Sequence, residues 1–394
     1  MSVNLIAQAR GSGQNVGASD ERRLSCFTGS RNNNFNLIRF VAASLVLFTH
    51  SFVLSTGSEN AEPLRTTLGT TFGTIAVDVF FVASGFLVTG SLLGRKNIAD
   101  FLYARIVRIY PGLLVAIALT VAVLGAAFSQ MRLSAFLGNP ETVRYIIKDS
   151  TLVSGVAGRL PGVFEHTPYK GAVNGSLWTL PYEVWMYAIL AIMWLIAGSA
   201  GPMREKSLKY VVLGAAALGT VVVTANILGI SAFSGVHGHL TQQYAMHLPA
   251  MFFVGSAFYL WRDRVVLSGS AFAICAATVF VSTYNRSAFA ICYQLLLGYI
   301  VLYLAYIPSG WIREFNRIGD YSYGMYIYAF PIQQIIASLI PGVSPLVMLM
   351  LSFPASLVLA ALSWHLIEQH ALRLKKRAVE RRRPSQSVLQ SCEG

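Results

Sequence analysis

The chain has 394 residues, of which 55% are hydrophobic and only 12% are charged, whereas a typical soluble domain carries about 25% charged residues. Thirty Lys and Arg residues against 17 Asp and Glu give a formal net charge of +13. These values exclude a disordered chain and argue against an ordinary soluble enzyme. Because the basic residues stand in short clusters between long apolar stretches, the composition predicts an all-α polytopic membrane protein.

Apolar stretches long enough to cross a bilayer, which takes about 20 residues in a helix, recur along the chain. We predict ten of them, at 37–57, 71–93, 109–129, 178–197, 210–230, 245–261, 266–283, 287–305, 321–341 and 346–367. Residues 1–35 are polar and lack the pattern of a cleavable signal peptide, and residues 369–394 are basic. The membrane domain is therefore expected to cover 36–368, between two polar tails.

The distribution of basic residues predicts that both termini are cytoplasmic. With the N-terminus inside, 22 of the 30 Lys and Arg residues lie on the cytoplasmic side, seven lie outside, and Arg39 lies within the first span. An even number of spans agrees with two cytoplasmic tails. Topology thus accounts for most of the positive charge. The tail run Arg381–Arg383 is expected to rest against anionic membrane lipid, and no nucleic-acid partner is expected.

Four ionisable residues stand out inside the predicted spans: Arg39 and His50 in the first, Asp78 in the second and Glu183 in the fourth. A charge at the bilayer centre costs about 2.5–3.5 kcal/mol on insertion scales, so such residues are candidates for function. Arg39 and His50 are 11 residues apart in the first span, a spacing that puts both on one helix face, about 16 Å apart along the axis.

Counting from the predicted span ends puts His50 and Asp78 roughly 10 Å below the outer face and Glu183 roughly 8 Å below it. At a common depth, the imidazole would be a general base and a neighbouring carboxylate would orient it. The alternative is that His50 bonds a neighbouring helix and Glu183 caps a kink, since buried polar groups also serve packing.

Small and basic residues mark two further places. Ser84 and Gly85 interrupt an aromatic run in the second span and allow close approach by a neighbouring helix or a ligand. Arg105 and Arg108 are predicted in the first cytoplasmic loop, ahead of a span that begins near Pro111. They either bind phosphate or mark the cytoplasmic side. The long outer segment 130–177 has mixed polarity. Its sequence is compatible either with a helix at the membrane interface or with a re-entrant segment.

Short motifs in a fixed order resemble the membrane-bound acyltransferase 3 family across nearly the whole chain, both tails excluded. They are Asn36-Leu37-Ile38-Arg39-Phe40 with the Arg39–His50 spacing, Val77-Asp78-Val79-Phe80-Phe81-Val82-Ala83-Ser84-Gly85-Phe86, Arg105-x-x-Arg108 followed by Pro111, Ser176-Leu177-Trp178-Thr179-Leu180-Pro181-Tyr182-Glu183, and Gly319-Asp320-Tyr321-Ser322-Tyr323-Gly324-Met325-Tyr326. The sequence departs from the family where Ala329 stands in place of a His and where Gln369-His370 follows Glu368. These departures leave the expected chemistry intact, but the resemblance then does not identify the acceptor or the subfamily.

The resemblance implies a bacterial inner-membrane enzyme. It would transfer an acyl group, usually acetyl from acetyl-CoA, across the membrane to a hydroxyl of a cell-surface or secreted glycan. The acceptor would be a glycan or a lipid-linked glycan on the periplasmic side. His50 would be the catalytic residue and Arg39 a donor-side partner. Arg105 and Arg108 would lie near the CoA phosphates, and Ser84 and Gly85 near the pantetheine arm. We add Tyr323 to this donor site, and Asp78 and Glu183 to the catalytic group.

A transporter or flippase of a glycan precursor is the alternative function, with the buried charges acting as a proton relay. The sequence shows no inverted repeat that favours it. His237, His239 and His247 lie at an outer loop and span edge, where we expect a polar loop rather than a metal site because no carboxylate or Cys joins the spacing. No metal is predicted. The oligomeric state is left open.

Overall fold

The computed structural model describes residues 23–30, 32–95, 97–198, 201–230 and 240–374, with side chains throughout except at 240–245. These residues are helical apart from loops and two isolated β-bridges, Arg23 with Val266 and Arg159 with Ala172. The structure therefore agrees with the predicted all-α class. The tail segments 1–22 and 375–394, which include Arg381–Arg383, lie outside the described residues, as do His237 and His239.

A helix occupies each of the ten predicted stretches. In chain order these helices are α2 (Phe35–Thr56), α4 (Phe72–Arg95), α5 (Ile98–Leu119) continued through a π turn by α6 (Gly125–Phe128), α9 (Leu180–Gly198), α10 (Arg204–Ile227), α11 (Leu240–Leu260), α12 (Gly269–Ser282), α13 (Arg286–Tyr306), α15 (Ser322–Leu339) and α16 (Pro345–Ser363) continued through a π turn to residue 374. Short helices in the connections are α1 (Leu24–Thr28), α3 (Pro63–Leu68), α7 (Leu133–Leu137), α8 (Pro140–Thr151) and α14 (Phe315–Ile318).

Seven of the helices in the described residues are long and apolar enough to cross a membrane. The apolar part of α11, Met246–Leu260, and helix α12 are shorter. Helix α15 carries the buried polar side chains Gln333 and Gln334 and is not among the seven. The chain is thus a multi-pass membrane protein by helix length and composition, and the count of ten spans stays a prediction.

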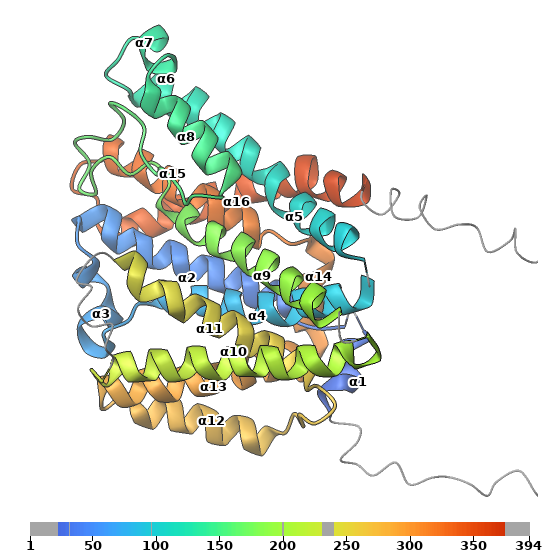
Figure 1. Ribbon diagram of the computed structural model, residues 1–394. Coiled ribbons are helices and arrows are strands. Elements are labelled where there is room, and N and C mark those ends of the chain that lie inside the picture. Colours follow the sequence, from blue (N-terminus) through green and yellow to red (C-terminus); the bar gives the residue numbers. More distant parts are fainter. Residues whose placement is uncertain (1–22, 31, 96, 199–200, 231–239, 375–394) are drawn as a thin grey trace, which may run out of the picture.

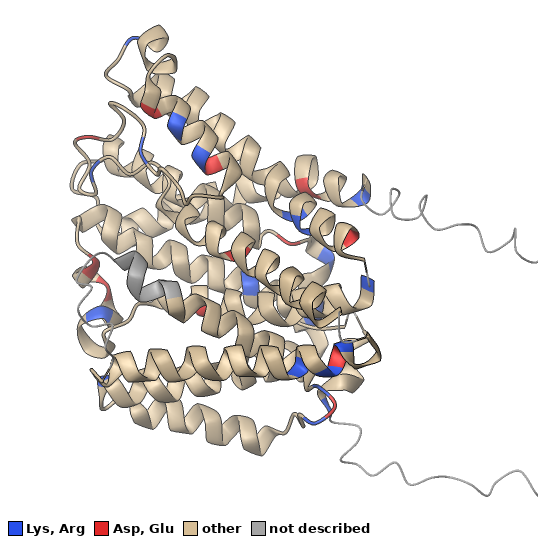
Figure 2. Cartoon of the chain, viewed as in Figure 1, with Lys and Arg blue, Asp and Glu red and all other residues tan. Residues whose placement is uncertain are grey.

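The helices lie roughly side by side in one bundle (Figure 1). Helices α10, α12 and α13 form one edge, α5 and α8 form the opposite edge, and α2 and α4 run between them. Charged residues are sparse along the middle of the bundle, and many of the basic ones gather at the end where α10 begins (Figure 2). Helix α1 and the end of the helix that continues α16 lie at this same end, while the side of the membrane that it faces stays a prediction.

Helices α4 and α11 are in unusually close contact through two glycines. A Cβ on Gly85 would lie 1.9 Å from the carbonyl oxygen of Phe252, and a Cβ on Gly255 would lie 2.0 Å from that of Val82. Gly85 therefore serves the approach of a neighbouring helix, which is one of the two alternatives that the sequence leaves open.

Helix α5 begins much earlier than predicted, so Arg105 and Arg108 are not in a loop. The Asn97 side chain accepts a hydrogen bond from the Ala99 N–H at 2.8 Å and caps the helix, and Pro111 lies inside it. The apolar window missed the first turns because they carry three charged residues, Asp100, Arg105 and Arg108. The consequence is that both arginines sit on a rigid helix and project into the bundle rather than into a loop.

The outer segment 130–177 contains a helix that turns back along α5. Tyr145 and Asp149 of α8 are buried, whereas Ile147 is exposed. The hydroxyl of Tyr110, near the middle of the helix that runs from 98 to 128, donates to the carbonyl oxygen of Thr151 at the end of α8. This contact favours the re-entrant alternative over a helix lying flat at the surface.

Candidate functional site

Two cavities lie end to end between α2, α4, α9 and α15. We call the first the arginine cavity, with a volume of about 100 Å³, and the second the histidine cavity, with a volume of about 320 Å³. The polar and aromatic residues that line the arginine cavity are Arg39, Phe80, Phe81, Ser84, Arg105, Arg108, Thr179, Glu183, Tyr187, Ser322, Tyr323 and Tyr326. Those in the histidine cavity include Thr49, His50, Asp78, Tyr169, Trp178 and Phe330.

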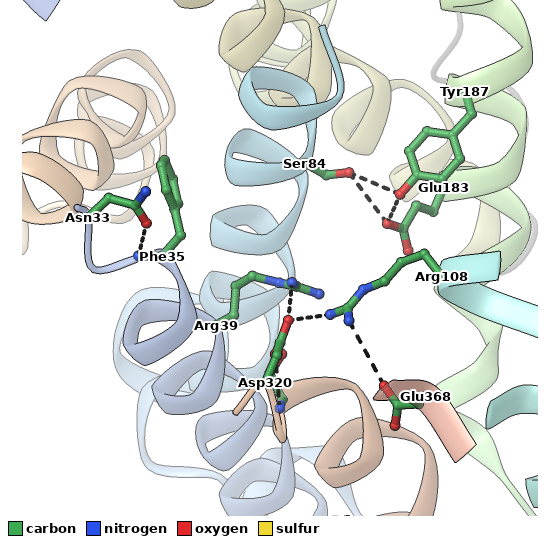
Figure 3. A network of polar contacts seen from close by, with 10 residues as sticks. Asn33, Phe35, Arg39, Ser84, Arg108, Glu183, Tyr187, Asp320 and Glu368 are labelled. Atoms are coloured by element: carbon green, nitrogen blue, oxygen red, sulfur yellow. Dashed lines mark hydrogen bonds and ion pairs between the residues drawn. The ribbon is translucent and has the colours of Figure 1, made fainter. Parts of the chain in front are cut away.

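Arg39 and Arg108 share one carboxylate beside the arginine cavity, that of Asp320 (Figure 3). The distance from Arg39 Nη1 to Asp320 Oδ2 is 2.8 Å, and Arg108 contacts the same oxygen. The other oxygen accepts hydrogen bonds from the hydroxyl and backbone N–H of Ser322. This arrangement ties α2, α5 and the start of α15 together through a single acidic group.

The electrostatics of Asp320 follow from these neighbours. Burial alone would raise the pKa of this carboxyl group, but the guanidinium groups of Arg108 and Arg39 outweigh burial and hold the pKa well below its usual range. Asp320 therefore stays ionised. Sequence reasoning quoted Asp320 only as part of a motif. The signal that could have found it was the need of Arg39, inside a span, for an opposite charge.

Arg108 has a second acidic neighbour, Glu368, in the last helix. Its Nη1 lies 3.9 Å from Glu368 Oε2, and the Glu368 side chain is only 3% exposed. The hydroxyl of Ser363 donates to the other Glu368 oxygen at 3.0 Å. The charge of Arg108 is thus neutralised by two carboxylates from distant parts of the chain.

Arg105 differs from its neighbour one helix turn away. No described carboxylate lies within 4 Å of its guanidinium group, and its Nε is buried without a hydrogen-bond partner. The group lies over the ring of Tyr187, 5.8 Å from the ring centre, and one of its nitrogens donates to Ser91 at 3.4 Å. Arg105 therefore supplies the arginine cavity with a cation that is not already paired.

Glu183 lies in the arginine cavity and not, as expected, level with His50. It accepts hydrogen bonds from Tyr187 and, at 3.4 Å, from Ser84. The difference arises because the 3₁₀ turn η4 (Gly175–Thr179) is folded into the bundle. A Cβ on Gly175 would meet the ring of Phe330 at 2.5 Å.

That same Phe330 ring lies 5.1 Å from the ring of His50, centre to centre. Gly175 is therefore close to the level of His50, and Glu183, eight residues further along, lies roughly 12 Å deeper. The structure thus separates the catalytic group expected from the sequence into two sets, with His50 and Asp78 in one cavity and Glu183 in the other.

Two other residues expected at the donor site lie in different surroundings. Tyr323 lines the arginine cavity, and its hydroxyl donates to the carbonyl oxygen of Ile109 at 2.8 Å, which joins α15 to α5. Gly85 faces α11, as described above, and is not among the residues that line either cavity. Ser84, its neighbour, does line the arginine cavity.

His50 projects from α2 into the histidine cavity, whereas Arg39 of the same helix lines the arginine cavity. Its ring packs edge-on against Phe330, and its Nδ1 is buried without a hydrogen-bond partner. No described group thus holds that nitrogen. The imidazole is available to a molecule that enters the cavity.

Asp78 lines the same cavity, but its contacts are with two other helices. One oxygen, Oδ2, is 2.9 Å from His247 Nε2 of α11 and accepts a hydrogen bond from the Tyr293 hydroxyl of α13, also at 2.9 Å. The other, Oδ1, is buried without a partner. His247 was expected in a polar loop. It lies inside α11, and the signal that could have found it was the need of a buried Asp78 for a partner.

Comparisons with known proteins match this chain along most of its length. A family model described as an acyltransferase domain matches residues 32–365. The chain is 27% identical over 356 residues to an O-acetyl transferase of Shigella phage Sf6, covering 87% of this chain and 96% of that protein. It is 28% identical over 377 residues to nodulation protein 10 of Rhizobium leguminosarum bv. viciae, covering 89% of this chain and 96% of that protein. No solved structure matches it.

Proposed function

The chain belongs to the acyltransferase domain family, whose model covers residues 32–365, and from that premise we propose that it transfers a short acyl group, in the first place acetyl, from a cytoplasmic acyl-CoA to a glycan hydroxyl on the periplasmic side of a bacterial inner membrane. The observation that carries the proposal is the pair of cavities that meet end to end, one lined by arginines and the other by His50. The O-acetyl transferase relative supports acetyl as the group transferred.

The arginine cavity suits the acyl-CoA substrate. The guanidinium group of Arg105 can bind a phosphate or the polar end of the pantetheine arm, because no described carboxylate lies within 4 Å of it. Ser84 and the apolar side chains Phe81, Leu87 and Val88 line the rest of the cavity, which a thioester arm can follow. Positive-inside charge supports a cytoplasmic entrance.

The histidine cavity suits a sugar acceptor. It is about three times larger than the arginine cavity and is lined by Trp178 and Tyr169 together with Asp78. Aromatic faces pack on the apolar face of a sugar ring, and carboxylate oxygens accept hydrogen bonds from its hydroxyl groups. A glycan, free or lipid-linked, is therefore the acceptor class that we propose.

In the proposed reaction, His50 takes the proton of the acceptor hydroxyl while the hydroxyl oxygen attacks the thioester carbonyl carbon. The new C–O bond forms, the C–S bond breaks, and the proton passes from His50 to the leaving thiolate. In the two-step alternative, His50 first carries the acyl group and then gives it to the hydroxyl. Both routes need the unpartnered imidazole that the histidine cavity provides.

A transporter or flippase would use the same buried groups as a proton relay. Family membership favours acyl transfer over this alternative. Release of free thiol from acetyl-CoA by the purified protein would decide for transfer. Binding of a lipid-linked sugar without any thiol release would decide for transport.

The experiment that tests the proposal combines thiol release with mass spectrometry of cell-surface glycans from cells with and without the gene. We expect the glycan to lose one acyl group per modified site when the gene is absent. His50→Ala should lower transfer by about 10²–10⁴-fold, the usual contribution of a general base, while the protein still accumulates in the membrane. His365→Ala, at an exposed residue bonded to Tyr321, is the matched control. Retained transfer in His50→Ala would overturn the assignment.

A further inference from the structure

The two cavities are separated by two side chains, those of Val77 and Tyr326, which are the only described residues that line both. Each of the four surrounding helices contributes residues to the arginine cavity on one side of this partition and, itself or through its preceding turn, to the histidine cavity on the other side. On α2, Arg39 lines the arginine cavity and His50 the histidine cavity. On α9 and its preceding turn, Glu183 and Trp178 divide in the same way. A molecule that passes from one cavity to the other must therefore pass between Val77 and Tyr326.

Tyr326 is held in this position from two sides. Its hydroxyl and that of Thr179 are 2.5 Å apart, and its ring packs edge-on against Phe80 with 5.8 Å between ring centres. Tyr326 is 7% exposed and Thr179 is 4% exposed, so water does not compete freely for this hydrogen bond. The ring is thus a buried, anchored side chain and not a loose one.

The partner of Tyr326 is itself fixed by the turn η4, which carries Thr179. The Asn174 side chain, which caps that turn, donates to the carbonyl oxygen of Ile327 at 2.8 Å, and Gly175 lies against Phe330. These contacts clamp the turn to α15 on both sides of Tyr326. The hydroxyl pair therefore joins two rigid elements.

His50 lies just beyond this partition. Its ring contacts Phe330, which follows Tyr326 by four residues and so lies one turn further along the same face of α15. A thioester that arrives through the arginine cavity reaches His50 only after its acyl group has passed Tyr326. The acyl group leads, because it is the end of the donor farthest from the CoA phosphates.

We infer that Tyr326 is the residue that limits the acyl group to a short chain and that its hydrogen bond to Thr179 closes the passage when no donor occupies it. The inference rests on the proposed function. With the ring in place, the gap opposite Val77 admits a small acyl group and excludes a longer one. With the hydrogen bond in place, water from the histidine cavity is kept from the thioester.

Water that reached the thioester would act as the acceptor. Its oxygen would attack the carbonyl carbon, the C–S bond would break, and a carboxylic acid and free thiol would form, with one water proton passing to the thiolate. Thiol release without a glycan therefore reports an open passage. Chain-length preference reports the width of the passage, and the two readouts are independent.

The experiment compares acetyl-, propionyl- and butyryl-CoA as donors for the purified full chain, with kcat/KM measured for each. Tyr326→Ala should raise the ratio of butyryl to acetyl transfer by about 10-fold or more, since one methylene in an apolar site commonly changes selectivity by 10-fold to 200-fold. Tyr326→Leu is a second variant that keeps an apolar side chain and should give a smaller change in the same direction. Tyr328→Ala, at a buried tyrosine of α15 that lines neither cavity, is the matched control.

The closing hydrogen bond is tested by Tyr326→Phe and Thr179→Val. Both keep the bulk at the partition, so the chain-length ratio should stay as in the wild type, while thiol release without acceptor should rise several-fold. An unchanged chain-length ratio in both Tyr326→Ala and Tyr326→Leu, with active wild-type protein, would overturn the inference and leave the proposed function intact. Wild-type protein that releases no thiol from any of the three donors, with or without glycan, would overturn both.

Discussion

The arginine cavity and the histidine cavity differ in whether the charged and polar side chains around them have partners. Beside the first, Arg39 and Arg108 meet the carboxylates of Asp320 and Glu368 in one network. In the second, the Nδ1 of His50 and one oxygen of Asp78 are buried without partners. A buried polar atom without a partner costs about 1–3 kcal/mol. The comparison therefore suggests that paired charges hold the bundle together and that unpaired atoms are kept for a substrate.

Arg105 lines the arginine cavity, but like the polar groups of the histidine cavity it has a buried atom without a partner. It stands one helix turn from Arg108, yet it has no described carboxylate within 4 Å and a buried Nε without a partner. The two arginines of one motif are therefore expected to do different work. Arg108 would stabilise the fold, and Arg105 would bind the donor.

The largest expected effect that tests this division is that of Arg108→Ala on stability. The change leaves Asp320 paired with Arg39 alone and Glu368 without a described cation within 4 Å, and breaking a buried pair in this way costs about 3–5 kcal/mol. An SDS unfolding titration of the purified protein measures the loss. Arg317→Ala is the control, because its ion pair with Glu314 is largely exposed and should contribute less than about 1 kcal/mol. Equal stability of Arg108→Ala and wild type would contradict a structural role.

A smaller effect, on binding rather than folding, is expected from Arg105→Ala. Loss of a hydrogen bond to a charged group, worth about 1.5–3 kcal/mol, should raise the donor KM roughly 10-fold to 100-fold, with little change in unfolding. Steady-state kinetics with acetyl-CoA varied at fixed acceptor measures the KM. Arg204→Ala, whose side chain stacks on Trp194 away from both cavities, should leave the donor KM unchanged. A large loss of stability with unchanged KM would place Arg105 with Arg108 instead.

The smallest expected effect concerns the partner of Asp78. His247→Gln keeps a hydrogen-bond donor near Asp78 but removes a group that can carry charge. The strength lost is the difference between a charged and a neutral hydrogen bond, about 1 kcal/mol. A thermal-shift measurement in one fixed detergent gives the change, and combining His247→Gln with Asp78→Asn tests the pairing. Strictly additive losses in the double variant would mean that the two side chains do not act together.

Several features of this fold could be predicted from the chain alone. Each of the ten apolar stretches holds a helix, because about 20 apolar residues have few other ways to satisfy their backbone groups in a membrane. The common face of Arg39 and His50 also follows from helix periodicity, and the structure has them at the two successive cavities. Such features depend on neighbours within one helix.

Other features of the candidate site could not be predicted because they depend on how distant segments meet. The depth of Glu183 was misjudged since the turn before α9 is folded into the bundle against Phe330 and does not start at the surface. Arg105 and Arg108 were assigned to a loop because they and Asp100 put three charges in the first turns of α5, which an apolar window therefore excludes. His247 was assigned to a loop edge although Asp78, 169 residues away, contacts it.

The sequence by itself determined that this chain is a helical membrane protein of the acyltransferase family, with Arg39 and His50 on one helix face, because composition, periodicity and motif order are properties of the chain. Only the tertiary structure decided which charges are paired and where the two cavities meet. Those outcomes depend on helix contacts such as Gly85 against Phe252 and on the hydroxyl pair of Thr179 and Tyr326. Contacts of this kind join residues far apart in the chain, and no local pattern records them.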